Sequence, residues 1–201
     1  PQADVWVFLD AYAPIHYHTE EDHSQLVQRI DQLWLWQRQT EVKMPVDTFE
    51  YAISAAGSVA NYYIKEGRTV GFACAADVLT VISPERGERQ LNKILETLTF
   101  LNSDGDLPLI GLVEAQAPSL PRASTVVLVT SSTHYTVDVA IDQMIMRNLR
   151  PVVVFVDAQT FGSELSSGEM IQRLKQRGVP VLIVSRDVDL KEALESSAWM
   201  L

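Results

Sequence analysis

The stretch TVVLVTSSTHYTVDVAIDQMIMRNLRPVVVFV, residues 125–156, decides the fold class of this chain. Its apolar runs at 125–130 and 152–156 have the length and the Val-rich composition of buried strands. Between them, apolar residues recur at helical spacing over 137–149. A strand, a helix and a second strand in this order predict two parallel strands of one sheet.

The same alternation continues toward the end of the chain. The pattern predicts a helix over 169–176, a strand over 179–185 and a helix over 190–197. Continuous Val, Ile and Leu strands separated by helices are typical of a parallel sheet that helices cover on both faces.

The first half adds a strand and a long helix. The apolar run Val5–Leu9 ends in Asp10, so the carboxylate of Asp10 is expected to leave the sheet into a loop. Asp47 predicts the start of a helix, because Glu50 follows it at the spacing of a capping box. The apolar pattern of this helix ends at Gly67.

Further elements complete the predicted sheet. The β-rich runs 69–75 and 78–82 are separated by two residues, which predicts a hairpin whose second strand lies at an edge. Leu91, Ile94, Leu95 and Leu98 mark one face of another helix, and 108–117 is predicted to be a shorter one.

These elements predict a doubly wound α/β fold with three layers and a mostly parallel sheet. No shift in composition divides the chain, so residues 1–201 are interpreted as a single domain with an insertion at 16–46. The chain begins without Met and enters a strand within a few residues, so we expect it to be a piece of a longer protein.

The ligand surface of a doubly wound fold is expected at the carboxyl ends of its strands.

Charge and composition exclude several classes of partner. The formal net charge is −10, and the Lys and Arg residues form no basic run, which disfavours nucleic acid and direct contact with a membrane surface. No apolar run is long enough to span a bilayer. Cys74 lies in an apolar run without basic neighbours, so it is interpreted as a core residue and not a nucleophile.

Several phrases, in order along the chain, resemble a known family. They are the strand that ends in Asp10, the helix Phe49-Glu50-Tyr51-Ala52, the phrase Gly67-Arg68-Thr69-Val70-Gly71-Phe72 and the edge segment Ile82-Ser83-Pro84-Glu85-Arg86-Gly87. From about residue 4 to 157 the chain resembles the bacterial family of unknown function called DUF fifty-eight, whose domain is similar to the von Willebrand factor A fold, which is Rossmann-like.

The resemblance implies a six-stranded sheet with one antiparallel edge strand. It also implies a protein partner, a MoxR-type AAA+ ATPase with which such domains are thought to assemble or activate other proteins. Members are typically tethered to a membrane by upstream helices, so a cytoplasmic domain of a membrane-tethered protein is expected here. The family's upstream Arg-Asp-Tyr and Ile-Asp-Trp phrases are missing from this chain.

In metal-binding A domains, an Asp-x-Ser-x-Ser loop, a Thr and a second Asp hold Mg²⁺. Here Asp10 matches the first ligand, but Tyr12 and Pro14 stand at the serine positions. Leu107 stands at the threonine and Ser131 at the second Asp. Because Mg²⁺ requires several oxygen ligands, we expect a degenerate metal site and no cofactor.

The insertion offers an alternative. His16, His18 and Glu20 would project to one side of an extended strand, and His23 follows, so a Zn²⁺ site is one interpretation and a solvated acidic loop the other. A metal-dependent binding protein or hydrolase using Asp10 with His16, His18 and His23 is the alternative function. Trp34 and Trp36 fit either a helix or a strand, and they either pack onto the domain or face a partner.

Hydrolase and nucleotide chemistry have weaker support. Ser131, Ser132 and His134 with Asp157 suggest a triad, but the nucleophile-elbow phrase Gly-x-Ser-x-Gly is absent. Neither Gly-x-Gly-x-x-Gly nor a P-loop follows any strand.

The sequence therefore predicts a non-catalytic protein–protein interaction domain, with the insertion as a specificity element; a scaffold that only self-associates is a third possibility. The predicted partner-binding residues are Asp10, Tyr12, Trp34, Trp36, Asp106, Ser131 and His134.

Overall fold

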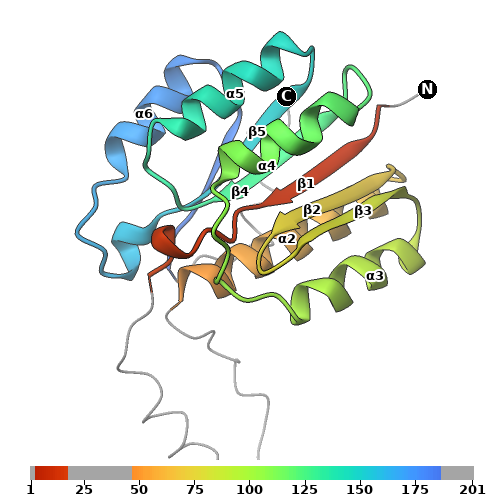
Figure 1. The fold of residues 1–201 in the computed structure, drawn as a ribbon, viewed down its shortest axis with the longest axis horizontal. Coiled ribbons are helices and arrows are strands. Elements are labelled where there is room, and N and C mark those ends of the chain that lie inside the picture. The colour runs from red at the N-terminus through yellow and green to blue at the C-terminus, as the bar shows by residue number, and fades with distance from the viewer. Residues whose placement is uncertain (1–2, 18–46, 187–201) are drawn as a thin grey trace, which may run out of the picture.

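The fold is known from a computed structural model that describes residues 3–17 and 47–186. Six strands form one sheet in the order β3-β2-β1-β4-β5-β6 (Figure 1). The strands are β1 (Val5–Leu9), β2 (Val70–Ala75), β3 (Leu79–Glu85), β4 (Thr125–Thr130), β5 (Arg150–Val156) and β6 (Val181–Val184). Only β3, at one edge, runs antiparallel to its neighbour. The predicted mostly parallel, doubly wound α/β sheet is therefore confirmed.

Helices cover both faces of the sheet, which makes three layers (Figure 1). One face carries α2 (Thr48–Lys65) and α3 (Glu88–Thr99), and the other carries α4 (Leu109–Gln116), α5 (Thr136–Met146) and α6 (Gly168–Gln176). In the part of the chain that the structure describes, short 3-10 turns also connect elements: η1 (Ala13–Ile15), η2 (Ala117–Ser119) and η3 (Ala158–Phe161). Both faces of the central strands are buried, which explains their continuous apolar composition.

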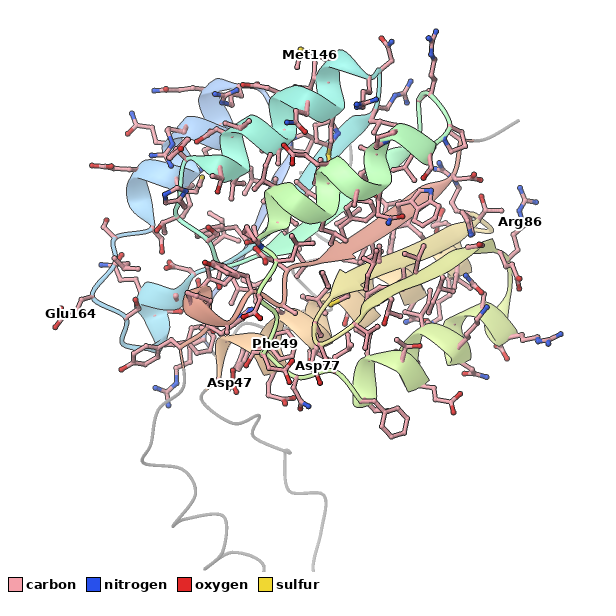
Figure 2. The ribbon with its side chains drawn as sticks, viewed as in Figure 1. Asp47, Phe49, Asp77, Arg86, Met146 and Glu164 are labelled. Carbon is pink, nitrogen blue, oxygen red and sulfur yellow. The ribbon has the colours of Figure 1, made fainter. Side chains whose placement is uncertain are left out.

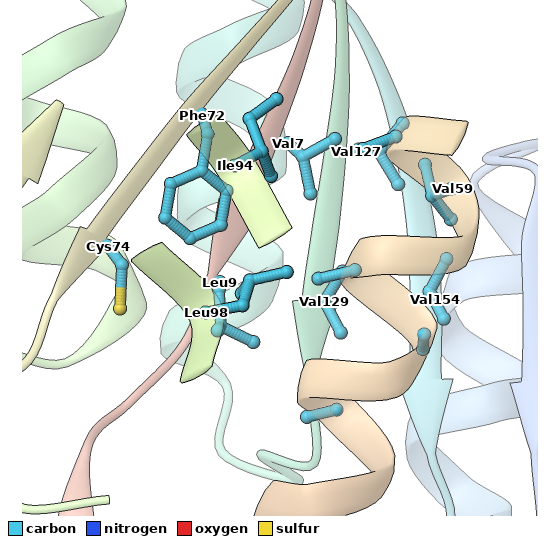
Figure 3. Packing of buried hydrophobic residues seen from close by; sticks show 14 of the residues in the cluster. Val7, Leu9, Val59, Phe72, Cys74, Ile94, Leu98, Val127, Val129 and Val154 are labelled. Carbon is cyan, nitrogen blue, oxygen red and sulfur yellow. The ribbon is translucent and has the colours of Figure 1, made fainter. Parts of the chain in front are cut away.

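The two faces of β1 supply two separate cores. Val7 and Leu9 point toward α2 and α3, where they pack with Phe72 and Val129 (Figure 3). Trp6 and Phe8 point toward α4 and α5. Because side chains alternate along a strand, Asp10 is expected on the α4 side of the sheet. Cys74 belongs to the first core, where burial raises the pKa of its thiol to about 12. Such a thiol stays protonated, in agreement with its interpretation as a core residue.

The helix predicted after Asp47 is confirmed. The Asp47 carboxylate accepts a 2.7 Å hydrogen bond from the backbone N–H of Phe49, as an N-cap does. The chain leaves the helix through Gly67, whose φ of +72° is the left-handed conformation that favours glycine.

Some predicted boundaries were wrong. Strand β3 continues to Glu85, beyond the predicted 78–82, because a bulge accommodates Pro84 at this edge of the sheet. Helix α5 ends at Met146, before the predicted end at 149, because Asn148 takes a left-handed φ of +59° and β5 follows at once. Strand β6 is shorter than the predicted 179–185. The predicted helix 190–197 lies outside the described residues.

Within the part of the chain that the structure describes, no helix combines the length and the apolar character needed to cross a bilayer.

Candidate functional site

A cleft of about 560 Å³ opens where β1, β4 and β5 end. The loop after β1, the start of α4, the loop after β4, the loop after β5 and Arg173 of α6 line it. Figure 1 shows η1 and the loop after β5 at this same end of the sheet. The cleft therefore lies at the carboxyl edge, where a doubly wound sheet places its ligands.

Asp10 forms part of the cleft lining and is only 2% exposed. Because Leu9 pairs with Val129 in the sheet, Asp10 lies beside Thr130. Asp10 Oδ2 accepts a 2.7 Å hydrogen bond from the Thr130 hydroxyl, and Oδ1 accepts a 3.3 Å bond from the Tyr12 N–H. Thr130 Oγ1 in turn accepts from the N–H of Ser132 at 3.0 Å. This chain of bonds ties the loop after β1 to the loop after β4.

Burial decides the charge state of Asp10. Desolvation raises its pKa to about 6, although the hydrogen bonds from Thr130 and Tyr12 act in the opposite direction. Among the residues described, no Lys, Arg or His side chain forms an ion pair with Asp10. Within the described part of the chain, Asp10 is therefore a buried carboxylate stabilised by hydrogen bonds and not by an ion pair.

The loop after β1 folds back over the end of β4. His16 Nε2 lies 2.9 Å from the backbone oxygen of Asp10, which can only accept, so Nε2 donates. The imidazole packs edge-on against Phe49, with ring centroids 4.8 Å apart. The Ser131 hydroxyl donates to the backbone oxygen of Ile15 at 2.9 Å. His16 and Ser131 thus hold this loop in place.

Gly105 fixes the same loop from the other side. Its N–H donates to Ala11 O at 3.0 Å and its oxygen accepts from Ala13 N at 2.9 Å. A Cβ on Gly105 would overlap the backbone oxygen of Ala75 and lie 2.8 Å from that of Ala11. The neighbouring Asp106 is exposed and does not line the cleft.

The donor set at Asp10 does not fit Mg²⁺. Tyr12 and Pro14 line the cleft where the resemblance would place serines. Leu107 is 40% exposed and offers no side-chain oxygen, and the Ser131 hydroxyl donates to Ile15 O. No group of three His, Cys, Asp or Glu side chains within 3–17 and 47–186 is arranged to hold a metal ion. His18, His23, Trp34 and Trp36 lie outside these residues.

The suggested triad is not assembled. Ser132 Oγ accepts from the backbone N–H of His134, whose exposed ring lies 3.1 Å from Thr136 Oγ1. Asp157 accepts from the N–H of Gln159 at 3.1 Å as the cap of η3. Each polar group therefore serves local loop structure.

Sequence reasoning missed the basic side of the cleft. Arg173 Nε lies 3.0 Å from Asp138 Oδ2, and Nη2 donates to Thr133 O at 3.1 Å, so α6 is tied to the loop after β4. Arg177 also pairs with Asp138, at 3.1 Å. Asp138 and Asp142 are four residues apart, and so are Arg173 and Arg177, which is about one helical turn in each helix. This matched spacing of acids and bases could have indicated that the two helices face each other.

The rim of the cleft is apolar and exposed. Tyr135 is 64% exposed and Leu165 is 63% exposed, and both line the cleft. Figure 2 shows the neighbouring Glu164 pointing outward from the loop after β5.

No family model matches the chain, and a search of the curated proteins found no match either. The resemblance to the DUF fifty-eight family stays a prediction.

Proposed function

We propose that this chain is a non-catalytic protein–protein interaction domain that binds a segment of another protein in the cleft. The observation that carries the proposal is an open cleft whose rim exposes Tyr135 and Leu165 beside Pro14, Ile15 and Leu109. Exposed aromatic and aliphatic side chains around a concavity are typical of sites that recognise another molecule.

The polar side chains of the cleft support a binding role over a catalytic one. The Ser131 hydroxyl donates to an oxygen of the protein itself, and the His134 ring lies 3.1 Å from Thr136 Oγ1. Thr130, beside the lining, likewise donates its hydroxyl to Asp10. A general base needs a free lone pair directed at a substrate proton, and a nucleophile needs such a base beside it. These side chains instead form hydrogen bonds that hold the loops around the cleft in place.

The partner we propose is a MoxR-type AAA+ ATPase, with which the domain would assemble or activate other proteins. This part rests on the resemblance to the DUF fifty-eight family, as does a position as the cytoplasmic domain of a membrane-tethered protein. The negative net charge of −10 favours a partner with a basic surface.

The test is direct binding between the chain and the purified MoxR-type ATPase of the same organism, measured by biolayer interferometry. Leu165→Glu places a charge on the apolar rim and is expected to weaken binding at least about tenfold. Met146→Glu is the matched control, because Met146 is 74% exposed at the other end of α5, away from the cleft (Figure 2).

The outcomes separate the two parts of the proposal. If the unmodified chain does not bind the ATPase, that partner is wrong. If it binds and Leu165→Glu binds equally well, the cleft is not the binding surface.

A further inference from the structure

Within residues 3–17 and 47–186, the cleft holds a carboxylate without a counter-charge. Asp10 is 2% exposed, and in the part of the chain that the structure describes it forms no ion pair. Arg173 lines the same cleft, but its guanidinium is engaged by Asp138 and by the backbone of Thr133. Among the described residues, the positive charge of Arg173 is therefore balanced by Asp138, whereas no described cation balances the negative charge of Asp10.

An ionised carboxylate in this position is costly, because burial removes the water that would stabilise its charge. The pKa of about 6 leaves Asp10 mostly ionised at neutral pH despite that cost. A cation that enters the cleft would recover part of the cost, whereas a neutral or acidic group would not. The buried carboxylate of Asp10 thus makes the cleft favour a positively charged ligand group.

The other walls suit a cation carried on an aliphatic stem. Ile15, Leu109 and Leu165 offer apolar surface along the cleft, and the Tyr135 ring stands at its rim. Long basic side chains bury their methylenes on such surfaces, and a cation over an aromatic face gains further stabilisation. The net charge of −10 attracts a basic partner from a distance.

We propose that the cleft takes a basic side chain, lysine or arginine, of the protein partner, with the charged group against the Asp10 carboxylate. This inference rests on the proposed function, since it names the chemistry of the partner segment that enters the cleft. It assigns Asp10 as the residue that determines specificity for a positive charge.

The first test uses NMR titration of the 1–201 chain with short capped peptides. The peptides Ala-Lys-Ala and Ala-Arg-Ala, acetylated and amidated at their ends, are compared with Ala-Lys-Ala whose Nε is also acetylated. Saturable shifts of the Tyr12 and Ser132 amides are expected with a basic peptide, and at least about tenfold weaker binding with the acetylated one. Equal binding of charged and acetylated peptides, or no saturable shift with either basic peptide, overturns the inference.

The second test uses variants and needs no peptide. Asp10→Asn keeps the size of the side chain and removes its charge, so its affinity for the purified ATPase is expected to fall at least about tenfold. Glu96→Gln, an exposed carboxylate on α3, is the matched control and is expected to leave affinity unchanged. If Asp10→Asn fails to fold, the comparison of charged and acetylated peptides on the unmodified chain still shows whether the cleft favours a positive charge.

The outcomes distinguish this inference from the proposed function. Binding that is lost in Leu165→Glu but kept in Asp10→Asn leaves the cleft as the binding surface and overturns the role of Asp10. Binding that both variants keep shows that the cleft is not the binding surface and overturns both the role of Asp10 and the place of binding in the proposed function. Amide shifts at Tyr12 and Ser132 with MgCl₂, and none with the basic peptides, would show that the cation is a metal ion and overturn the inference.

Discussion

The Thr130 hydroxyl donates a 2.7 Å hydrogen bond to the carboxylate of Asp10, 120 residues away in sequence, across the junction of β4 and β1. The Thr130 oxygen also accepts from the N–H of Ser132. One side chain therefore joins the buried carboxylate to the loop that lines the cleft. The stability and the shape of the site depend on this pair.

The charge of Asp10 gives the first prediction. Its pKa is about 6 in the folded chain and 3.8 in its ordinary state, so the folded form holds the proton more tightly. The contribution of Asp10 to stability is then fully present below about pH 4 and is lost as the pH rises through about 6. The pKa difference corresponds to about 3 kcal/mol.

Asp10→Asn removes this titration. We expect the free energy of unfolding of the variant, relative to the unmodified chain, to rise by about 3 kcal/mol between about pH 4 and pH 7. Urea unfolding across this range measures it, with Glu96→Gln as the control. A difference between Asp10→Asn and the unmodified chain that stays constant with pH would contradict the assignment.

Gly105 gives the second prediction. A Cβ at this position would overlap the backbone oxygen of Ala75 and crowd that of Ala11, and neither backbone can move without disturbing a strand end. Gly105→Ala is expected to destabilise the fold by about 2–4 kcal/mol. Thermal and urea unfolding measure the loss.

Gly178→Ala is the instructive comparison for Gly105→Ala. Gly178 has a φ of +70° but no atom within contact distance of its Cβ position, so its cost is limited to backbone strain of about 1–2 kcal/mol. If Gly105→Ala lowers the free energy of unfolding less than Gly178→Ala does, the claim that a Cβ at residue 105 meets a steric clash is wrong.

Gln90 gives the third prediction. Its buried side-chain amide donates to the backbone oxygens of Val70 and Ser83, at 2.6 and 2.8 Å, beside the bulge between β2 and β3. Gln90→Leu fills a similar volume but leaves both oxygens without this donor, so we expect a loss of about 1–3 kcal/mol. Asn92→Leu, on the exposed part of the same helix, is the control for urea unfolding. Equal stability of the two variants would mean that water replaces the amide.

The fold could be predicted because its central strands are buried on both faces. The runs at Val5–Leu9, Thr125–Thr130 and Arg150–Val156 have few polar interruptions, and such strands require helices on both sides. The bulge at Pro84 could not be predicted, because it is a feature of how β3 pairs with β2, where Val70 pairs with Glu85 but Phe72 pairs with Ile82. The local pattern of one strand carries no information about its register with another strand.

The site could be predicted in part. Parallel strands bring their carboxyl ends together, so Asp10 and Ser131 were expected at one edge and both line the cleft. The role of Thr130 could not be predicted, because Thr130 is the last residue of an apolar strand. The pairing of Leu9 with Val129 makes Thr130 the neighbour of Asp10. The role of Gly105 could not be predicted, because the close approach of its backbone to those of Ala11 and Ala75 joins segments that are far apart in the sequence.

The ends of the insertion give the last prediction. Thr48 N–H donates to Tyr17 O at 3.2 Å, and Tyr17 N–H donates to Thr48 Oγ1 at 2.8 Å. Residues 17 and 48 therefore lie side by side, and a short linker can join them without moving a strand or a helix. Because closing a shorter loop also costs less entropy, replacing 18–46 by a Gly-Ser linker of about four residues should leave the midpoint of thermal unfolding unchanged or higher.

Binding by the same shortened chain tests whether the insertion contributes specificity. We expect affinity for the ATPase to fall at least about tenfold while the shifts caused by the basic peptides persist, because Asp10 and the cleft walls lie outside the replaced segment. A variant in which residues 18–46 are replaced by a scrambled sequence of the same length is the control, because it separates the effect of the sequence of the insertion from the effect of its length. Full affinity in the shortened chain would assign recognition to the cleft alone, whereas loss of cooperative unfolding would show that the insertion is part of the fold.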